Sequence, residues 1–217
     1  MLQPGNEHRT PGFSGQMRHP GIVGFGRIGR LLARELIVQE GSGHQLRLRA
    51  IAVRSIDVAS LHKRASLLKI DSVHGDFPGT IKVDEENLAL IINGRPVYFI
   101  PAPDPTKADY TAYGISKALL IDNSGAFRDD TALSKHLEGK GVDKVLLTAP
   151  GKGVPNIVHG VNQNNIGKKD RIISAASCTT NAISPVLKVV NDHFGIERGH
   201  LETIHAYTND QNLVDNM

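Results

Sequence analysis

Residues 21–40 read GIVGFGRIGRLLARELIVQE, and the prediction of the fold starts from this segment. Gly24, Gly26 and Gly29 have the spacing G-x-G-x-x-G, and apolar residues then recur at helical intervals. A glycine loop that opens a helix lets backbone N–H groups approach a pyrophosphate at the positive end of the helix, because no Cβ blocks the approach. Three glycines at this spacing also occur in plain turns, so the prediction of a nucleotide-binding loop depends on the segments around it.

Those segments alternate between strand and helix patterns. Residues 46–53, LRLRAIAV, are a strand candidate, and further candidates lie in KALLIDNSGAF, DKVLLTAPG and RIISAAS. The alternation predicts an α/β fold, namely a doubly wound (Rossmann), mostly parallel sheet with helices on both faces. Residues 79–100 contain three short β-type runs with an Asn-Gly turn pair between two of them. We therefore expect an antiparallel meander inserted in this sheet.

Two features near the glycine loop are unusual for an NAD site. Only Ile22 and Val23 favour a strand before the loop, behind a proline that cannot donate to a central ladder, so we expect a shortened first strand. At the end of the next strand, an NAD site places an acidic residue for the ribose hydroxyls, but this chain has Arg54. A guanidinium there favours the 2′-phosphate of NADP. The alternative is that Arg54 is solvated and Asp57 bends back to the ribose, so the sequence leaves NAD or NADP open.

Composition limits the classes of function. The chain has 217 residues, of which 40% are hydrophobic, and this is enough for a packed core. The formal net charge is only +3 and the basic residues form no long run, so we expect no nucleic-acid partner. No apolar run reaches the roughly 20 residues of a membrane span and no signal peptide is evident, so we expect a cytoplasmic protein with no membrane contact.

The same features suggest a domain division. Residues 1–18 are rich in proline, glycine and polar residues, and we interpret them as a disordered tail. Residues 19–177 hold the alternating pattern and are the expected NAD(P)-binding domain.

The single cysteine, Cys178, stands where a strand pattern changes to the helical pattern TTNAISPVLKVVNDHFG. Unpaired N–H groups and the dipole at a helix N-terminus favour a thiolate, although a lone cysteine is more often a buried structural residue. The segment HLETIHAYTNDQ alternates like a strand and carries His205, a candidate base that could equally be an ordinary strand histidine. Asn123, Ser124 and Thr148 follow other strands, so we expect them to share one crevice with Cys178. We expect no metal site.

Four segments, in this order, carry a family resemblance: GFGRIGR, DSVHGDF, SAASCTTN and HAYTNDQ. They resemble phosphorylating glyceraldehyde-3-phosphate dehydrogenase, and the similarity runs from about Ile22 to Met217. The interval of 27 residues from Cys178 to His205 matches the spacing between nucleophile and histidine in that family. The segments IDNSGAFRD, LLTAPGKG and HAYTNDQNLVDNM are most similar to a longer, divergent bacterial branch of this family. The resemblance implies a glycolytic oxidoreductase that uses NAD or NADP, glyceraldehyde 3-phosphate and inorganic phosphate, and forms a homotetramer.

The resemblance also implies roles for residues. Cys178 would attack the aldehyde to form a thiohemiacetal, hydride would pass to the nicotinamide, and phosphate would release an acyl phosphate. His205 would lower the pKa of the thiol and act as base and acid. Asn181 matches a residue at the start of the helix and is interpreted as structural. Other matches fall on the substrate-phosphate positions Ser177, Thr179 and Thr208, and on the pyrophosphate-loop positions Arg27 and Ile28.

The family's substrate domain continues well past the histidine. The resemblance therefore implies that residues 178–217 are the start of an α+β catalytic (substrate) domain, which is incomplete in this chain, and that the chain is an inactive fragment. Two alternatives remain open. One is a non-catalytic NAD(P)-binding module, and the other is an erythrose-4-phosphate dehydrogenase. The residues that would set the carbon count of the substrate are not among the motifs found, so the exact aldehyde is left open.

Overall fold

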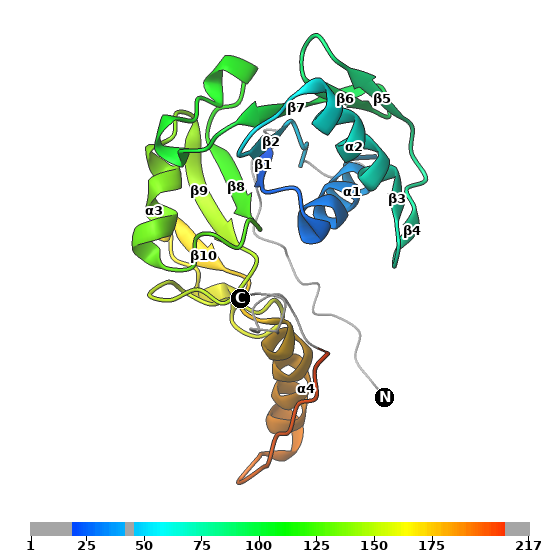
Figure 1. The fold of residues 1–217 in the computed structure, drawn as a ribbon. Helices are drawn as coiled ribbons and strands as arrows, with labels where there is room; N and C mark the ends of the chain where they lie inside the picture. The colour runs from blue at the N-terminus through cyan, green and yellow to red at the C-terminus, as the bar shows by residue number, and fades with distance from the viewer. Residues whose placement is uncertain (1–18, 42–45, 207–217) are drawn as a thin grey trace, which may run out of the picture.

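A computed structural model describes residues 19–41 and 46–206, and it confirms the predicted α/β architecture. Eight strands form one sheet in the order β10-β9-β8-β1-β2-β7-β6-β5 (Figure 1). The predicted tail lies outside the described residues. The strands of this sheet are β1 Pro20–Val23, β2 Ala50–Val53, β5 Ile81–Asp84, β6 Ala89–Ile92, β7 Arg95–Pro101, β8 Ala118–Asp122, β9 Val142–Leu147 and β10 Ile172–Ser174.

Helices and one small hairpin complete the fold. The hairpin pairs β3 with β4 in an antiparallel sheet of two strands. A short 3-10 helix, η1, precedes β8 in the chain. The bounds of these elements are α1 Arg27–Gly41, α2 Val58–Lys69, β3 Ile70–Asp71, β4 Gly75–Asp76, η1 Pro105–Lys107, α3 Asp130–Glu138 and α4 Cys178–Phe194.

The sheet is parallel from β10 to β7 and antiparallel beyond it. β1 pairs in parallel with both β2 and β8, and the parallel part extends through β9 and β10 on one side and β7 on the other. β6 and β5 then pair in antiparallel fashion with β7 and with each other. The meander predicted at residues 79–100 is therefore confirmed, and it extends one edge of the parallel sheet.

Side chains alternate between the two faces of the sheet, as the strand period of two requires. The paired residues Ile22, Ile51 and Ile121 face one core, which also holds buried residues of α1 and α2. The paired residues Leu120 and Val145 face the opposite side, where α3 contributes Leu133. Figure 1 shows α1 and α2 together and α3 beside β9, away from them. Helices thus cover both faces, as predicted.

The first strand is short, as predicted, and it still occupies the centre of the sheet. β1 has four residues and lies between β2 and β8. Pro20 is its first residue, which is where a strand tolerates a missing N–H. Gly21 has a packing role, because a Cβ there would lie 2.8 Å from Leu120 Cδ2. Pairing with β2 and β8 holds Pro20 and Gly21 in a strand, although neither residue type favours one.

Three expectations about element bounds were wrong. β2 covers only residues 50–53 of the predicted 46–53. Residues 128–141 predict a helix with Gly141 just past its end, but α3 ends at Glu138 with Gly139 as its C-cap, and Gly141 lies further on with φ of +92°. The strand predicted around His205 is not present at residues 201–206, and the rest of that segment lies outside the described residues. A strand needs a neighbour that pairs with its backbone, and no described segment pairs with residues 201–206.

α4 follows β10 and extends away from the sheet (Figure 1). None of its residues is buried. Its exposed apolar side chains are Val186, Leu187, Val189, Val190 and Phe194. Among the described residues, no helix combines the length and the apolar character that crossing a membrane requires.

Candidate cofactor and active site

The glycine loop joins β1 to α1, and each of its three positions requires glycine, or leaves space beside it, for a different physical reason. Gly24 has φ of +87°, which an L side chain rarely adopts. Gly29 lies so close to its neighbours that a Cβ would come within 2.3 Å of the Gly24 carbonyl oxygen and 2.5 Å of Asn123 Oδ1. A Cβ on Gly26 would meet nothing within 4 Å, so its surroundings are open. The loop therefore packs on one side and leaves room for a ligand on the other.

A cavity of about 620 Å³ lies beside this loop. It is formed at the carboxyl ends of β1, β2, β7 and β8. Since β1 lies between β2 and β8, this is the point where the order of the strands reverses, and α/β sheets bind ligands at such points. The lining residues are Val23, Gly24, Phe25, Gly26, Ala52, Val53, Arg54, Ser55, Arg64, Ala102, Pro103, Pro105, Tyr110, Asn123, Ser124, Ala126, Phe127 and His136.

The cavity brings together some of the predicted cofactor residues and leaves out others. Gly24, Gly26, Arg54 and Ser124 line it, whereas Ile28 is exposed elsewhere on α1. The Arg27 side chain turns to the β3–β4 hairpin, where Nη2 donates to Ser72 Oγ at 2.9 Å. Gly29 does not line the cavity and packs against the Gly24 carbonyl group and Asn123.

Thr148, which we expected in the same crevice, lies behind it. Its backbone N–H and its Oγ1 both donate to the Asp122 carbonyl oxygen, at 2.9 and 3.1 Å. These bonds fix the end of β9 against the end of β8. Thr148 is not among the residues that line the cavity.

A buried carboxylate–imidazole pair stabilises the wall of the cavity, and sequence reasoning missed it. Asp122 Oδ2 lies 2.8 Å from His136 Nε2, and both side chains are almost completely buried. Asp122 Oδ1 accepts a hydrogen bond from the Ser124 N–H at 2.7 Å. Burial and, to a lesser degree, the charge of Asp122 raise the pKa of Tyr110 well above its usual value. An aspartate inside the apolar run ALLID was the available signal.

Arginine side chains lie where the ribose of a dinucleotide is expected. Arg54 and Ser55 follow β2, and Arg64 reaches the same cavity from α2. Arg54 is exposed, and the carboxylate of Asp57 caps a helix. Its Oδ1 accepts from the Ser60 N–H at 2.7 Å as the N-cap of α2, and Asp57 does not line the cavity. No sequence pattern pointed to Arg64, because its position in the cavity depends on how α2 packs.

Cys178 is the first residue of α4, as predicted, and it is exposed. Ser177 is the N-cap, and its Oγ accepts from the Thr180 N–H at 2.9 Å. The preceding Ala176 has φ of +59°. Asn181 Nδ2 holds this tight turn by donating to the carbonyl oxygens of Ala175 and Ser177, at 2.7 and 2.8 Å. The structural interpretation of Asn181 is therefore confirmed.

Thr179 lies between Cys178 and His205. Its Oγ1 is 3.0 Å from His205 Nε2 and 4.0 Å from Cys178 Sγ. The helix start thus places the thiol and the imidazole in one neighbourhood without a direct contact between them. Cys178 does not line the cofactor cavity, and Thr208 lies outside the described residues. No group of three metal-ligating side chains occurs within the described part of the chain.

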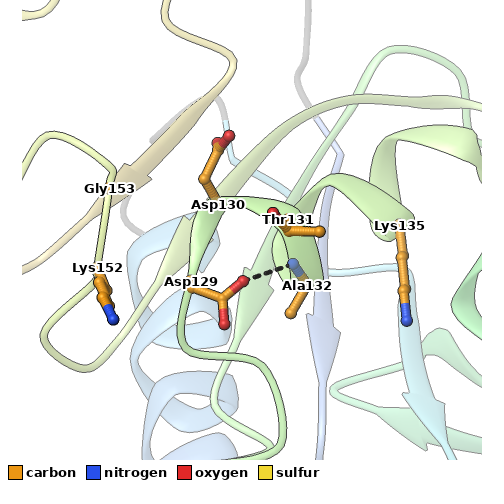
Figure 2. A pocket seen from close by; sticks show the side chains of 7 residues that line it. All are labelled: Asp129, Asp130, Thr131, Ala132, Lys135, Lys152 and Gly153. Carbon is orange, nitrogen blue, oxygen red and sulfur yellow. Dashed lines mark hydrogen bonds between the residues drawn. The ribbon is translucent and has the colours of Figure 1, made fainter.

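A second hollow, of about 610 Å³, lies at the start of α3 (Figure 2). Its charged residues are Asp129, Asp130, Lys135 and Lys152, so its formal charge is balanced. Asp129 is committed to capping α3, since its Oδ1 accepts from the Ala132 N–H at 2.9 Å. This hollow has neither the glycine loop nor the strand ends of the first, so the first is the better cofactor site.

Comparison with known proteins agrees with this geometry. Residues 19–130 match the family model described as the NAD binding domain of glyceraldehyde 3-phosphate dehydrogenase, and residues 177–217 match the C-terminal domain of the same enzyme. The matched NAD binding domain supports the predicted use of NAD or NADP.

Individual relatives cover nearly the whole chain. A glyceraldehyde-3-phosphate dehydrogenase-like protein of Pseudomonas aeruginosa is 61% identical over 196 residues, which are 90% of this chain and 42% of the relative. The glyceraldehyde-3-phosphate dehydrogenase of Thermotoga maritima is 40% identical over 92% of this chain and 57% of the relative. The chain thus spans about half the length of these relatives. The family predicted from the four sequence segments is confirmed, and the chain belongs to the glyceraldehyde 3-phosphate dehydrogenase family of oxidoreductases.

Proposed function

We propose that this chain provides the cofactor domain and the nucleophile of a phosphorylating dehydrogenase for glyceraldehyde 3-phosphate. In this proposal residues 19–177 bind NAD(P) and residues 178–217 begin the catalytic domain. The observation that carries it is the cavity at the strand reversal, which the glycine loop borders with open space at Gly26. A homotetramer and a cytoplasmic location stay predictions.

The residues of the chain have distinct roles in this reaction. The N–H groups of the loop from Gly24 to Gly29 and the dipole of α1 would hold the cofactor pyrophosphate. Bound NAD(P) supplies the hydride acceptor. The sulfur of Cys178, the first residue of α4, would attack the aldehyde carbon as a thiolate and form a C–S bond. The carbonyl oxygen takes the π electrons and a proton, which gives the hydroxyl of the thiohemiacetal.

His205 would then remove the proton from the hydroxyl of the thiohemiacetal as hydride leaves its carbon, which gives a thioester. Inorganic phosphate attacks the thioester carbon, the C–S bond breaks, and the acyl phosphate leaves with the thiolate restored. Ser177, Thr179 and Thr208 are proposed to hold the phosphate groups. The position of Thr179, between the thiol and the imidazole, supports such a role.

The test measures both halves of the site in the 217-residue chain. Calorimetry with NAD and NADP tests the cavity, and the rate of alkylation by iodoacetamide tests Cys178. We expect His205→Asn to slow alkylation at neutral pH, because it removes the base proposed to act on the thiol. His200→Asn is the matched control, since His200 is an exposed histidine nearby in the chain. Equal rates in the parent and in His205→Asn would contradict the proposed pairing.

One observation favours a second candidate, a non-catalytic NAD(P)-binding module. The segment with His205 pairs with no strand among the described residues, and Cys178 lies outside the cofactor cavity. Positioning accounts for about 7 to 11 kcal/mol of a catalysed barrier, so a thiol and an imidazole that are not held in place give little turnover. We expect this chain to bind cofactor but to be nearly inactive with phosphate and either glyceraldehyde 3-phosphate or erythrose 4-phosphate. Rapid NAD(P)H formation would contradict that expectation.

A further inference from the structure

We infer that Arg64, together with Arg54, binds a phosphate group on the 2′ position of the adenosine ribose, and that Arg64 thereby selects NADP over NAD. This inference rests on the proposed function, because it takes the cavity beside the glycine loop as the cofactor site.

The position of Arg64 places it at the ribose end of that site. In a sheet of this topology the pyrophosphate lies at the first glycine loop and the adenosine ribose lies at the end of the second strand. β2 is that second strand, and Arg54 and Ser55 follow it directly. Arg64 Nη2 donates to the Ser55 carbonyl oxygen at 3.4 Å, so the guanidinium lies beside the end of β2.

The charges around the cavity favour an anion at this end. Arg54 and Arg64 line the cavity, and no aspartate or glutamate is among its described lining residues. The ribose of NAD normally gives its hydroxyl hydrogen bonds to a carboxylate. The acidic residue that follows β2 is Asp57, and its carboxylate caps α2. The site therefore offers a cation where NAD needs an acceptor.

The Arg64 guanidinium is held in place and partly removed from water. It lies over the Phe99 ring, 5.8 Å from the ring centroid. Its Nε is buried and has no hydrogen-bond partner among the described residues. A buried donor without a partner is costly, and an oxyanion near the guanidinium would reduce that cost. The planar guanidinium also matches a phosphate in a bidentate geometry, which a lysine does not.

The experiment compares NADP with NAD, which differ only by the 2′-phosphate. Both dissociation constants are measured by calorimetry for the 217-residue chain, for Arg64→Met and for Lys63→Met. Methionine keeps an unbranched apolar side chain against Phe99 but removes the charge. A charge-assisted hydrogen bond contributes about 1.5–3 kcal/mol. We therefore expect Arg64→Met to raise the dissociation constant for NADP by about tenfold or more. NAD should change by less than about twofold in the same variant.

Lys63→Met is the matched control. It removes one positive charge from the neighbouring position on α2, but Lys63 does not line the cavity. We expect it to leave the ratio of the two dissociation constants unchanged. Binding of NAD to Arg64→Met shows that the variant is folded. Arg64→Lys is a second variant, which keeps the positive charge but loses the planar guanidinium. We expect the preference of Arg64→Lys for NADP over NAD to lie between those of the parent and Arg64→Met.

The outcomes separate the two proposals. Equal weakening of NAD and NADP in Arg64→Met would overturn the inference, because the side chain would then act on a part common to both cofactors. Equal affinity of the unmodified chain for both cofactors would also overturn it, while leaving the cofactor site intact. Failure of the unmodified chain to bind either cofactor would overturn the cofactor site and the inference together.

Discussion

Gly29→Ala should destabilise the protein, whereas Gly26→Ala should not, although both glycines belong to the same loop. The added Cβ of Gly29→Ala would lie 2.3 Å from the Gly24 carbonyl oxygen and 2.5 Å from Asn123 Oδ1. The first of these is a backbone atom, held by a residue whose own N–H donates to the Ala52 carbonyl oxygen at 2.9 Å. The clash therefore cannot be relieved by rotating one side chain.

The expected magnitude follows from two opposing terms. Overpacking typically costs about 1–3 kcal/mol, and a contact with backbone belongs at the upper end of that range. Gly29 lies within α1, where alanine is favoured over glycine by about 1 kcal/mol. The net loss is then about 2 kcal/mol, which corresponds to a fall in Tm of about 4–8 °C for a chain of this size.

The assay is thermal and urea unfolding of the parent and the two variants without cofactor. Gly26 precedes α1 and has open space around its missing Cβ, so Gly26→Ala should change the free energy of unfolding by less than about 0.5 kcal/mol. Gly26→Ala should still lower the affinity for NAD(P), because its Cβ would fill the space into which the cofactor is proposed to bind. Equal stability of Gly29→Ala and Gly26→Ala would refute the reasoning from close packing.

Two further predictions concern buried carboxylates. Asp122→Ala should lower the free energy of unfolding by about 3 kcal/mol, because it leaves the buried His136 imidazole and the Ser124 N–H without their partner; denaturant unfolding measures this, and a loss below about 1 kcal/mol would contradict it. The Val73 and His74 N–H groups hold the pKa of Asp71 well below its usual range, so its stabilisation is present above the unfolded pKa of about 4 and is lost as the pH falls through the lower folded pKa. Asp71→Asn should therefore be less stable at neutral pH and lose less stability in acid than the parent, whereas the exposed Asp76→Asn should behave like the parent; identical acid unfolding profiles would contradict this.

Short sequence patterns were enough to predict those parts of the fold that are determined by residues close together in the chain. The glycine spacing, the meander and the start of α4 at Cys178 each follow from short-range sequence, and each is present. Arg64 and the pair of Asp122 and His136 could not be predicted in the same way, because each lies in the site only after distant segments pack together. The alternation around His205 predicted a strand, but alternation alone provides no pairing neighbour.

The central position of β1 has a consequence for synthesis of the protein. Ile22 pairs with Ile51 on one side and with Ile121 on the other, so the second partner is made roughly 100 residues after the first strand. At about 5–20 residues per second, a ribosome takes about 5–20 s to supply it. Throughout that interval one edge of β1 is open to wrong pairing, and contacts of such long sequence separation also form slowly. Nascent chains that stop before β8 should therefore need chaperone protection, whereas chains that include β8 should not.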